Sequence, residues 1–241
     1  MENQEYYINK VLQGDCVSVM KDMPSNFIDL VVTDPPYLMA FKNNMREDGK
    51  FNSEIPNDTD TPQNRQMIAD YIKDCYRIMK DDTAMYLFCS MDKVDLFKIE
   101  IEKYFTLKNI IVWVKKGQTM GDLEAQYGKQ YEFIMYANKG RRPINGKRIS
   151  DVWHFDRTES KTQDHQNQKP LTLIQRCINN HSNEGDIVFD GFAGSGTTAV
   201  ASLLLKRRYI AIELLDKYCD IINRRLEEIS MVQPLFGVDI L

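Results

Sequence analysis

The sequence predicts one α/β domain built around a mostly parallel sheet. Apolar segments of strand length alternate with amphipathic segments of helix length along the chain, which is the pattern of an α/β fold. No internal repeat and no low-complexity tract interrupts this alternation. The 241 residues are enough for one well-packed domain and few for two.

Strands and helices are assigned from apolar runs and from helical periodicity. The expected strands are Val11 to Gln13, Ile28 to Thr33, Ala84 to Cys89, Asn109 to Val114, Glu132 to Ala137, Asp186 to Asp190 and Tyr209 to Glu213. The expected helices are Thr61 to Met79, Asp92 to Tyr104, Pro170 to Asn180, Gly196 to Leu205 and Asp216 to Ile229. No helical pattern separates the fourth strand from the fifth, so these two are expected to pair antiparallel. Residues 41–60 and 139–167 are expected to be loops.

Composition argues against several classes of protein. The longest apolar runs, such as Ala199 to Leu205, are too short to span a bilayer, and the acidic N-terminus lacks the sections of a signal peptide. The five cysteines are odd in number and form no CxxC pair, so we expect reduced thiols in a cytoplasmic protein. The three histidines lack the spacing of metal ligands, and no metal site is expected.

A basic segment stands out against the formal net charge of −4. An acidic protein can hold a nucleic acid backbone through one local basic surface, because counterion release depends on the contacts made. A solvated loop is the alternative interpretation, and a charge run alone favours it. The segment has no acidic residue, and its basic residues are Lys139, Arg141, Arg142, Lys147 and Arg148.

A rigid tetrapeptide, Asp34, Pro35, Pro36 and Tyr37, follows the predicted strand Ile28 to Thr33. The two prolines fix the backbone, and ligands of an open α/β sheet gather at the carboxyl ends of its strands. An amino group on a planar base would find two acceptors there, in the Asp34 carboxylate and the Pro35 carbonyl, and a ring to stack on in Tyr37. A structural turn with an Asp cap is the alternative.

A glycine-rich loop, Asp190 to Ala199, follows another predicted strand and opens a helix. Glycines permit close approach of the backbone to a ligand, while a helix N-terminus favours an anionic group. The next strand ends in Glu213, whose carboxylate can accept hydrogen bonds from ribose hydroxyls. These features indicate a nucleoside site. A dinucleotide fingerprint at Gly194 to Ala199 is the competing interpretation, but only one strand and one helix follow it.

Together these motifs resemble the amino-methyltransferases of DNA, specifically their circularly permuted β class, in which the catalytic tetrapeptide precedes the cofactor loop. The resemblance covers nearly the whole chain, with the motifs in family order. Gly14 to Cys16 resembles the adenine-contacting element, Asp34 to Tyr37 the catalytic motif, His165 to Pro170 the H-x-T-Q-K-P element, Phe192 to Thr198 the cofactor loop and Glu213 the ribose ligand.

The resemblance implies a Rossmann-like methyltransferase fold, with a seven-stranded, mostly parallel sheet that has one antiparallel strand. It implies one methyltransferase domain over residues 1–241, with a short target-recognition insertion at about 138–167. It also implies S-adenosylmethionine as cofactor and double-stranded DNA as substrate, which the basic segment, on its charge, is expected to contact. The implied catalytic residues are Asp34, Pro35, Pro36 and Tyr37, and the implied cofactor-binding residues are Asp15, Asp34, Gln168, Lys169, Phe192, Gly194, Ser195, Gly196, Thr197 and Glu213.

The sequence departs from the family pattern at two positions. Gly191 stands where the family usually has proline, which is expected to loosen the loop entrance, and Asn167 replaces the usual threonine. The recognition segment is short, so sequence reading is expected to draw also on residues 41–60 or on the second subunit of a homodimer. Gln233 to Phe236 resembles a docking peptide for the replication sliding clamp, although an apolar tail packed on its own domain is the simpler interpretation.

The resemblance also implies a reaction, which is methylation of adenine N6 in a flipped-out base that stacks on Tyr37. Asp34 and the Pro35 carbonyl would hold the amino hydrogens, and the Tyr37 hydroxyl is not expected to take part. Adenine is favoured over cytosine N4 because family members acting on cytosine more often carry serine at the position of Asp34. A methyltransferase-like DNA-binding module without turnover is the alternative from another class, and the intact Asp34 and Tyr37 disfavour it.

Overall fold

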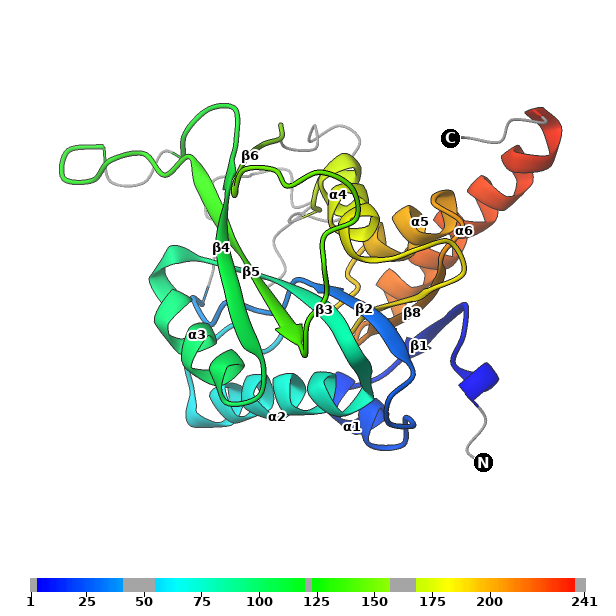
Figure 1. The fold of residues 1–241 in the computed structure, drawn as a ribbon. Coiled ribbons are helices and arrows are strands. Elements are labelled where there is room, and N and C mark those ends of the chain that lie inside the picture. Colours follow the sequence, from blue (N-terminus) through cyan, green and yellow to red (C-terminus); the bar gives the residue numbers. More distant parts are fainter. Residues whose placement is uncertain (1–3, 41–54, 120–122, 157–167, 237–241) are drawn as a thin grey trace.

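The computed structural model of the protein describes residues 4–40, 55–119, 123–156 and 168–236, with side chains described as far as residue 231. Within these residues, eight strands form one sheet in the order β1-β8-β7-β2-β3-β5-β4-β6 (Figure 1). The strands are β1 (Lys10–Gln13), β2 (Ile28–Thr33), β3 (Met79–Cys89), β4 (Thr106–Val114), β5 (Tyr131–Lys139), β6 (Val152–His154), β7 (Ile187–Asp190) and β8 (Arg208–Glu213).

Strand β5 runs against its neighbours β3 and β4, while every other neighbouring pair in the sheet is parallel. The predicted fold class, with a mostly parallel sheet and one antiparallel strand, is therefore confirmed. The sheet has one strand more than the seven expected. The extra strand, β6, pairs with β4 and lies in a segment expected to be a loop. Its three residues are too few to show a periodic pattern.

Helices cover both faces of the sheet (Figure 1). One face packs against α1 (Cys16–Lys21), α2 (Pro62–Ile78) and α3 (Val94–Glu102). The other packs against α4 (Leu171–His181), α5 (Thr197–Leu204) and α6 (Asp216–Phe236). Two short 3₁₀ turns, η1 (Gln4–Tyr6) and η2 (Met91–Lys93), complete the regular elements. The described part of the chain includes no helix with the length and apolar composition that crossing a bilayer requires.

Strand β2 lies in the middle of this three-layer arrangement and is apolar on both faces. Ile28 and Val31 pack into the core beneath α1 to α3, and Leu30 and Val32 pack into the core beneath α4. A strand covered on both sides has a continuous apolar sequence rather than an alternating one. Its carboxyl end is consequently a fixed point, and the Asp34 tetrapeptide begins directly after it.

Local sequence explains where α2 begins and ends. The Thr61 hydroxyl accepts a hydrogen bond from the Asn64 backbone amide at 3.2 Å, and Pro62 occupies the first turn, where no amide donor is needed. The helix ends at Ile78 because Met79 adopts an extended backbone conformation and starts β3. Strand β3 therefore begins five residues before the predicted Ala84.

Helix α1 was not predicted from the sequence because its six residues span less than two full turns. Asp15 caps it by accepting a hydrogen bond from the Ser18 amide at 2.9 Å. At the other end of the chain, α6 continues to Phe236, so the backbone of the proposed clamp-docking segment is helical. That docking function stays a prediction. All five cysteines are buried free thiols.

Candidate active site

The carboxyl ends of the parallel strands surround a cavity of about 640 Å³. Asp34 follows β2 at its rim, Gly191 to Ser195 follow β7, Glu213 ends β8 and Asp15 follows β1. The motifs that lie far apart in the sequence therefore meet at one edge of the sheet, as the strand-end argument predicts. Among the described residues, no group of three or more His, Cys, Asp or Glu side chains is arranged to hold a metal ion.

The tetrapeptide after β2 is held rigidly. Pro35 and Pro36 are buried, while Asp34 and Tyr37 are partly exposed to the cavity. The Tyr37 hydroxyl donates a hydrogen bond to Asp34 Oδ1 at 2.6 Å. The hydroxyl was expected to have no role, but its contact fixes the orientation of the carboxylate.

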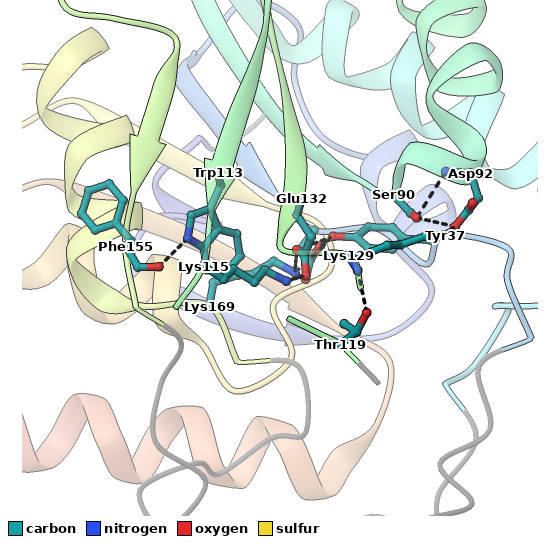
Figure 2. Close-up of polar contacts among 11 residues, drawn as sticks. Tyr37, Ser90, Asp92, Trp113, Lys115, Thr119, Lys129, Glu132, Phe155 and Lys169 are labelled. Atoms are coloured by element: carbon teal, nitrogen blue, oxygen red, sulfur yellow. Dashed lines mark hydrogen bonds and ion pairs between the residues drawn. The ribbon is translucent and has the colours of Figure 1, made fainter. Parts of the chain in front are cut away.

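Lys169 completes a polar cluster around this carboxylate. Its Nζ lies 2.7 Å from Asp34 Oδ2 and 3.1 Å from the Tyr37 hydroxyl. The same Nζ lies 3.2 Å from Oε2 of Glu132, and the Lys115 ammonium contacts the other Glu132 oxygen. Figure 2 shows Lys115, Lys169, Glu132 and Tyr37 converging on one point. We call Asp34, Tyr37, Lys115, Glu132 and Lys169 the site cluster.

The electrostatics of the site cluster separate its two carboxylates. Burial raises the pKa of Asp34, and Lys169 opposes that shift without cancelling it. Burial also opposes ionisation of Glu132, but Lys169 and Lys115 together outweigh it and lower the pKa of Glu132 to about 2. Burial and the neighbouring carboxylates raise the pKa of Tyr37 well above its usual value, so its hydroxyl remains a donor.

The glycine loop between β7 and α5 takes its shape from residues without side chains. Gly194 and Gly196 have positive φ of 54° and 79°, a conformation that favours glycine. A β-carbon on Gly196 would lie 2.7 Å from the Ile222 side chain of α6, so the loop can pack this closely on the helix only with glycine there.

Glu213 ties this loop to the end of β8. Its Oε2 accepts a hydrogen bond from the Gly194 amide at 2.8 Å, and its Oε1 accepts one from the Leu215 amide at 2.9 Å. Each carboxylate oxygen has a second lone pair, so Glu213 can also accept from ribose hydroxyls in the cavity that it lines. The acceptor and the bare loop backbone fit the nucleoside part of S-adenosylmethionine.

The remaining predicted cofactor residues line the same cavity. They are Asp15, Gln168, Lys169, Phe192, Ser195 and Thr197. Among them, Lys169 also contacts the predicted catalytic carboxylate of Asp34. Residues 165–167 of the H-x-T-Q-K-P element, including the Asn167 departure, lie outside the described residues.

Gly191 was expected to loosen the loop entrance, but the loop is closely packed at this position. A β-carbon there would lie 2.4 Å from the ring of Tyr71, which is fully buried in α2. The Tyr71 ring also contacts Phe192 edge-on at a centroid distance of 4.7 Å, and its hydroxyl donates to Thr33 at 2.8 Å. The space of the usual proline is therefore filled by a tyrosine from a neighbouring helix.

The predicted DNA-binding segment is only partly on the surface. Lys139 is 6% exposed, and its ammonium donates to Asn26, to the Tyr76 carbonyl and to the Met79 carbonyl. It ends β5, at the edge of the sheet opposite the cavity, because β5 is antiparallel. Its assignment as a phosphate contact is therefore wrong.

Arg142 is half-buried, and its guanidinium donates to the His181 carbonyl at 3.3 Å. Arg141, Lys147 and Arg148 are exposed. Lys147 and Arg148 belong to the stretch that leads into the edge strand β6. Of the basic segment, these three side chains are accessible to a duplex.

Two members of the site cluster, Lys115 and Glu132, were not predicted. Each carries a weak signal in the sequence, since Lys115 directly follows an apolar strand and Glu132 is a charge within another. Their convergence depends on the register of β4 against β5, which pairs Trp113 with Glu132. That register is not visible in either segment alone.

The fold and the site together define a class of enzyme, the S-adenosylmethionine-dependent methyltransferases. Residues 28–224 match the family model N6_N4_Mtase, described as DNA methylase, and the chain belongs to this family. The predicted family, DNA methyltransferase activity and cofactor are therefore confirmed.

Known proteins with similar sequences or structures agree with this assignment. YubD of Escherichia coli (strain K12) is 33% identical over 214 residues, covering 88% of this chain and 87% of YubD. DNA adenine methyltransferase YhdJ of the same strain is 28% identical over 262 residues, covering 91% of this chain and 83% of YhdJ. The crystal structure of the M1.HpyAVI–SAM complex superimposes with a TM-score of 0.67 at 25% identity, covering 90% of this chain and 98% of that one.

Proposed function

We propose that this DNA methyltransferase methylates N6 of adenine in duplex DNA, with the target base turned out of the helix into the cavity. The observation that carries the proposal is the position of Asp34. Its carboxylate lines the cavity that Gly194 and Glu213 also line, and the Pro35 backbone is fixed beside it. A methyl donor seated on the loop and an amino group held by Asp34 would thus share one enclosure.

Two parts of the site would hold the two reactants. The nucleoside of the cofactor would be held by Glu213 and the loop from Phe192 to Thr197, with Asp15 at the end of β1. When bound, S-adenosylmethionine supplies a methyl group on a positively charged sulfur.

One aromatic ring of the cavity is placed to stack on a planar base. Tyr37 lines the cavity and is partly exposed, whereas Phe88 and Trp113 at the same wall are 0% and 2% exposed. Stacking on such rings is worth roughly 1–3 kcal/mol per base in proteins that bind single strands, and turning a base out of a duplex requires that kind of compensation. The ring of Tyr37, whose hydroxyl contacts Asp34, is accordingly proposed to receive the base.

Asp34 and the Pro35 carbonyl would accept hydrogen bonds from the amino hydrogens of adenine. This arrangement draws the nitrogen lone pair out of conjugation with the ring and directs it at the methyl group, so catalysis comes from positioning and fixed electrostatics. The Tyr37 hydroxyl would keep Asp34 in the orientation that accepts these bonds.

The duplex is proposed to contact the exposed basic residues Lys147 and Arg148 through its phosphates, whereas Arg141 lies beside Asp82 at the edge of the sheet opposite the cavity. Such contacts set the position of the protein on DNA without reading its sequence. Residues 41–54 and 157–167, to which part of sequence reading was assigned, lie outside the described residues. A homodimer, the sliding clamp as partner and the target-recognition role of residues 138–167 stay predictions.

The experiment is to express the chain in a host without DNA methylation of its own. Mass spectrometry of DNA nucleosides and sequencing that detects modified bases then identify the product and its sequence context. We expect N6-methyladenine in the wild-type strain and none in the matched Asp34→Ala strain. N4-methylcytosine instead would overturn the adenine assignment, and the absence of either base in DNA bearing every sequence context would indicate a module without turnover.

A further inference from the structure

Lys169 connects the two carboxylates of the site cluster. Its Nζ lies 2.7 Å from Asp34 and 3.2 Å from Glu132, and its side chain is only 9% exposed. Lys115 contacts Glu132 from the other side, and its ammonium lies 4.6 Å from the centre of the Trp113 ring. The order is thus ammonium, carboxylate, ammonium, carboxylate, with equal numbers of each charge. Figure 2 shows its first three members, Lys115, Glu132 and Lys169.

Both oxygens of Asp34 are engaged in this arrangement. Tyr37 donates to Oδ1 at 2.6 Å, and Lys169 contacts Oδ2 at 2.7 Å. Each oxygen keeps a second lone pair, but a substrate amino group that binds Asp34 approaches a carboxylate already shared with a buried ammonium and weakens that ion pair. If Lys169 had no other partner, loss of its contact with Asp34 would leave the Lys169 ammonium as an uncompensated buried charge, which is strongly unfavourable.

Glu132 avoids this uncompensated charge because it already contacts Lys169. Lys115 contacts the other Glu132 oxygen, so Glu132 offers Lys169 a second carboxylate that is itself held by an ion pair. Asp34 lies on the loop after β2, whereas Glu132 lies in β5, two strands away in the sheet. The two anions therefore belong to different elements, and Lys169 contacts both.

We propose that Glu132 is a positioning residue for methyl transfer, which retains Lys169 when the amino group of the target base takes an oxygen of Asp34. Lys115 is the anchor that keeps Glu132 in place. This inference rests on the proposed function, because it requires an amino group to bind Asp34. It assigns Glu132 a role that acts through Lys169 rather than through contact with the base.

The ionisation of the site cluster supports this role. Glu132 has a pKa of about 2, because the two lysines outweigh burial, and it is therefore a constant negative charge at any assay pH. Burial raises the pKa of Asp34, Lys169 opposes the shift, and Glu132 adds to it. The other titratable groups that act on this region are Tyr37 on the same loop, Lys115 at the end of β4, Cys89 at the end of β3 and Asp190 at the end of β7.

The test replaces Glu132 with glutamine and compares the pH dependence of methyl transfer with that of the wild type. With the charge gone, Lys169 pairs with Asp34 alone, and the amino group binds a carboxylate held by an ammonium that has no second carboxylate. We expect kcat to fall on the order of 10- to 100-fold. We also expect the acid limb of the pH profile to move to lower pH, because a negative neighbour of Asp34 has been removed. Glu132→Asp keeps the charge and should keep the wild-type acid limb, with partial activity.

Glu100→Gln is the matched control. Glu100 accepts from Lys103 at 2.6 Å in α3, and its side chain is 18% exposed, close to the 22% of Glu132. Its replacement should alter neither kcat nor the pH profile. Stabilisation of each variant by S-adenosylmethionine in thermal unfolding should equal that of the wild type, since neither change touches the nucleoside site.

A second readout does not depend on turnover. Carbon-13 NMR of the Asp34 carboxyl in the protein without cofactor should show a lower pKa in Glu132→Gln than in the wild type. If Glu132→Gln does not fold, the charge-balanced variant Glu132→Gln with Lys115→Gln takes its place, and the same losses are expected. Wild-type kcat with an unmoved acid limb in either variant would overturn the inference. Failure of the proposed function is separate, because it appears in the wild type as the wrong methylated base.

Discussion

The two ends of α4 contact two different kinds of buried polar cluster. Lys169, two residues before the helix, joins the charged site cluster at the cavity. His181, the last residue of the helix, is buried between two tyrosines, with Nδ1 2.6 Å from the Tyr86 hydroxyl and Nε2 2.9 Å from the Tyr136 hydroxyl. We call Tyr86, Tyr136 and His181 the histidine cluster.

The clusters differ in charge and in access to solvent. Burial, assisted by Arg142, lowers the pKa of His181 to about 4, so the histidine cluster is neutral and closed. The site cluster instead retains paired charges and opens on a cavity. Fully satisfied neutral networks stabilise one structure, whereas perturbed charges beside a cavity are typical of functional sites. Disruption of the first should affect stability, and disruption of the second should affect activity.

Asp34→Ala should have the largest effect on activity of any change considered. Loss of one preorganised electrostatic group typically lowers kcat roughly 100- to 1,000-fold, and Asp34 is the acceptor proposed to orient the amino group. Tritiated methyl transfer to unmethylated genomic DNA, at saturating cofactor, measures this directly. Thermal unfolding checks that the variant folds. Near-normal turnover would contradict the claim that the site cluster determines activity.

The histidine cluster should make stability depend on pH. His181 has a pKa of about 4 when folded and about 6.5 when unfolded, so between these values the unfolded chain binds more protons. Stability due to His181 is complete above about pH 6.5 and is lost as the pH falls towards 4, by up to about 3 kcal/mol. The measurement is urea unfolding from pH 7.5 to 5.

The variant His181→Phe isolates this contribution, because other groups titrate in the same window. Burial raises the pKa of Asp190 to about 7. Between pH 4 and 7 the folded state therefore binds the extra proton at Asp190, so this group lowers stability as the pH rises, whereas His181 raises it. The difference between wild type and His181→Phe removes that term. His154→Phe, on the exposed strand β6, is the matched control. Equal pH slopes in wild type and His181→Phe would contradict the assignment.

Gly191→Ala tests whether packing alone holds the cofactor loop. The new methyl group would overlap the buried Tyr71 ring, and overpacking of this kind typically destabilises by about 1–3 kcal/mol. Denaturant unfolding measures the loss, and Tyr71→Leu in the same protein should relieve part of it. A double variant that is as unstable as the sum of the two single variants would show that the ring is not the obstacle.

The smallest expected effect is at the basic residues before β6. Lys147→Ala with Arg148→Ala removes at most two phosphate contacts, so the slope of log affinity against log salt should fall by about 2 or less. Lys98→Ala with Lys103→Ala, on α3, is the control. Fluorescence anisotropy of a labelled duplex measures the slopes. An unchanged slope would return this segment to the class of solvated loops.

The strand-end motifs were predictable because each is local. Asp34 directly follows an apolar strand, and Glu213 directly ends one, so position in the sequence fixes position at the sheet edge. Gly194 and Gly196 likewise indicate a turn whose backbone needs positive φ. The family, the fold and the parts of the cavity wall after β1, β2, β7 and β8 followed from these residues.

The remaining features depend on pairing between distant segments. Glu132 reaches Lys115 and Lys169 only through the antiparallel register of β5. The same strand carries Lys139 into a buried position, where its charge serves three acceptors within the fold. A basic residue at the end of a strand has the same appearance in the sequence whether it is exposed or buried. Tertiary packing decided both cases.

The pairing of β1 with β8 has a consequence for how the chain folds. Asn9 and Tyr209 are hydrogen-bonded although 200 residues separate them, so two strands from opposite ends of the described part of the chain are neighbours in the sheet. Pairing at such separation closes a very long loop and is intrinsically slow. Strand β1 is therefore without its partner strand, with an open edge, until β8 has been synthesised. An open edge of this kind is a site for pairing with another chain, so aggregation during expression should respond to changes in β1 more than to changes in the central strand β2.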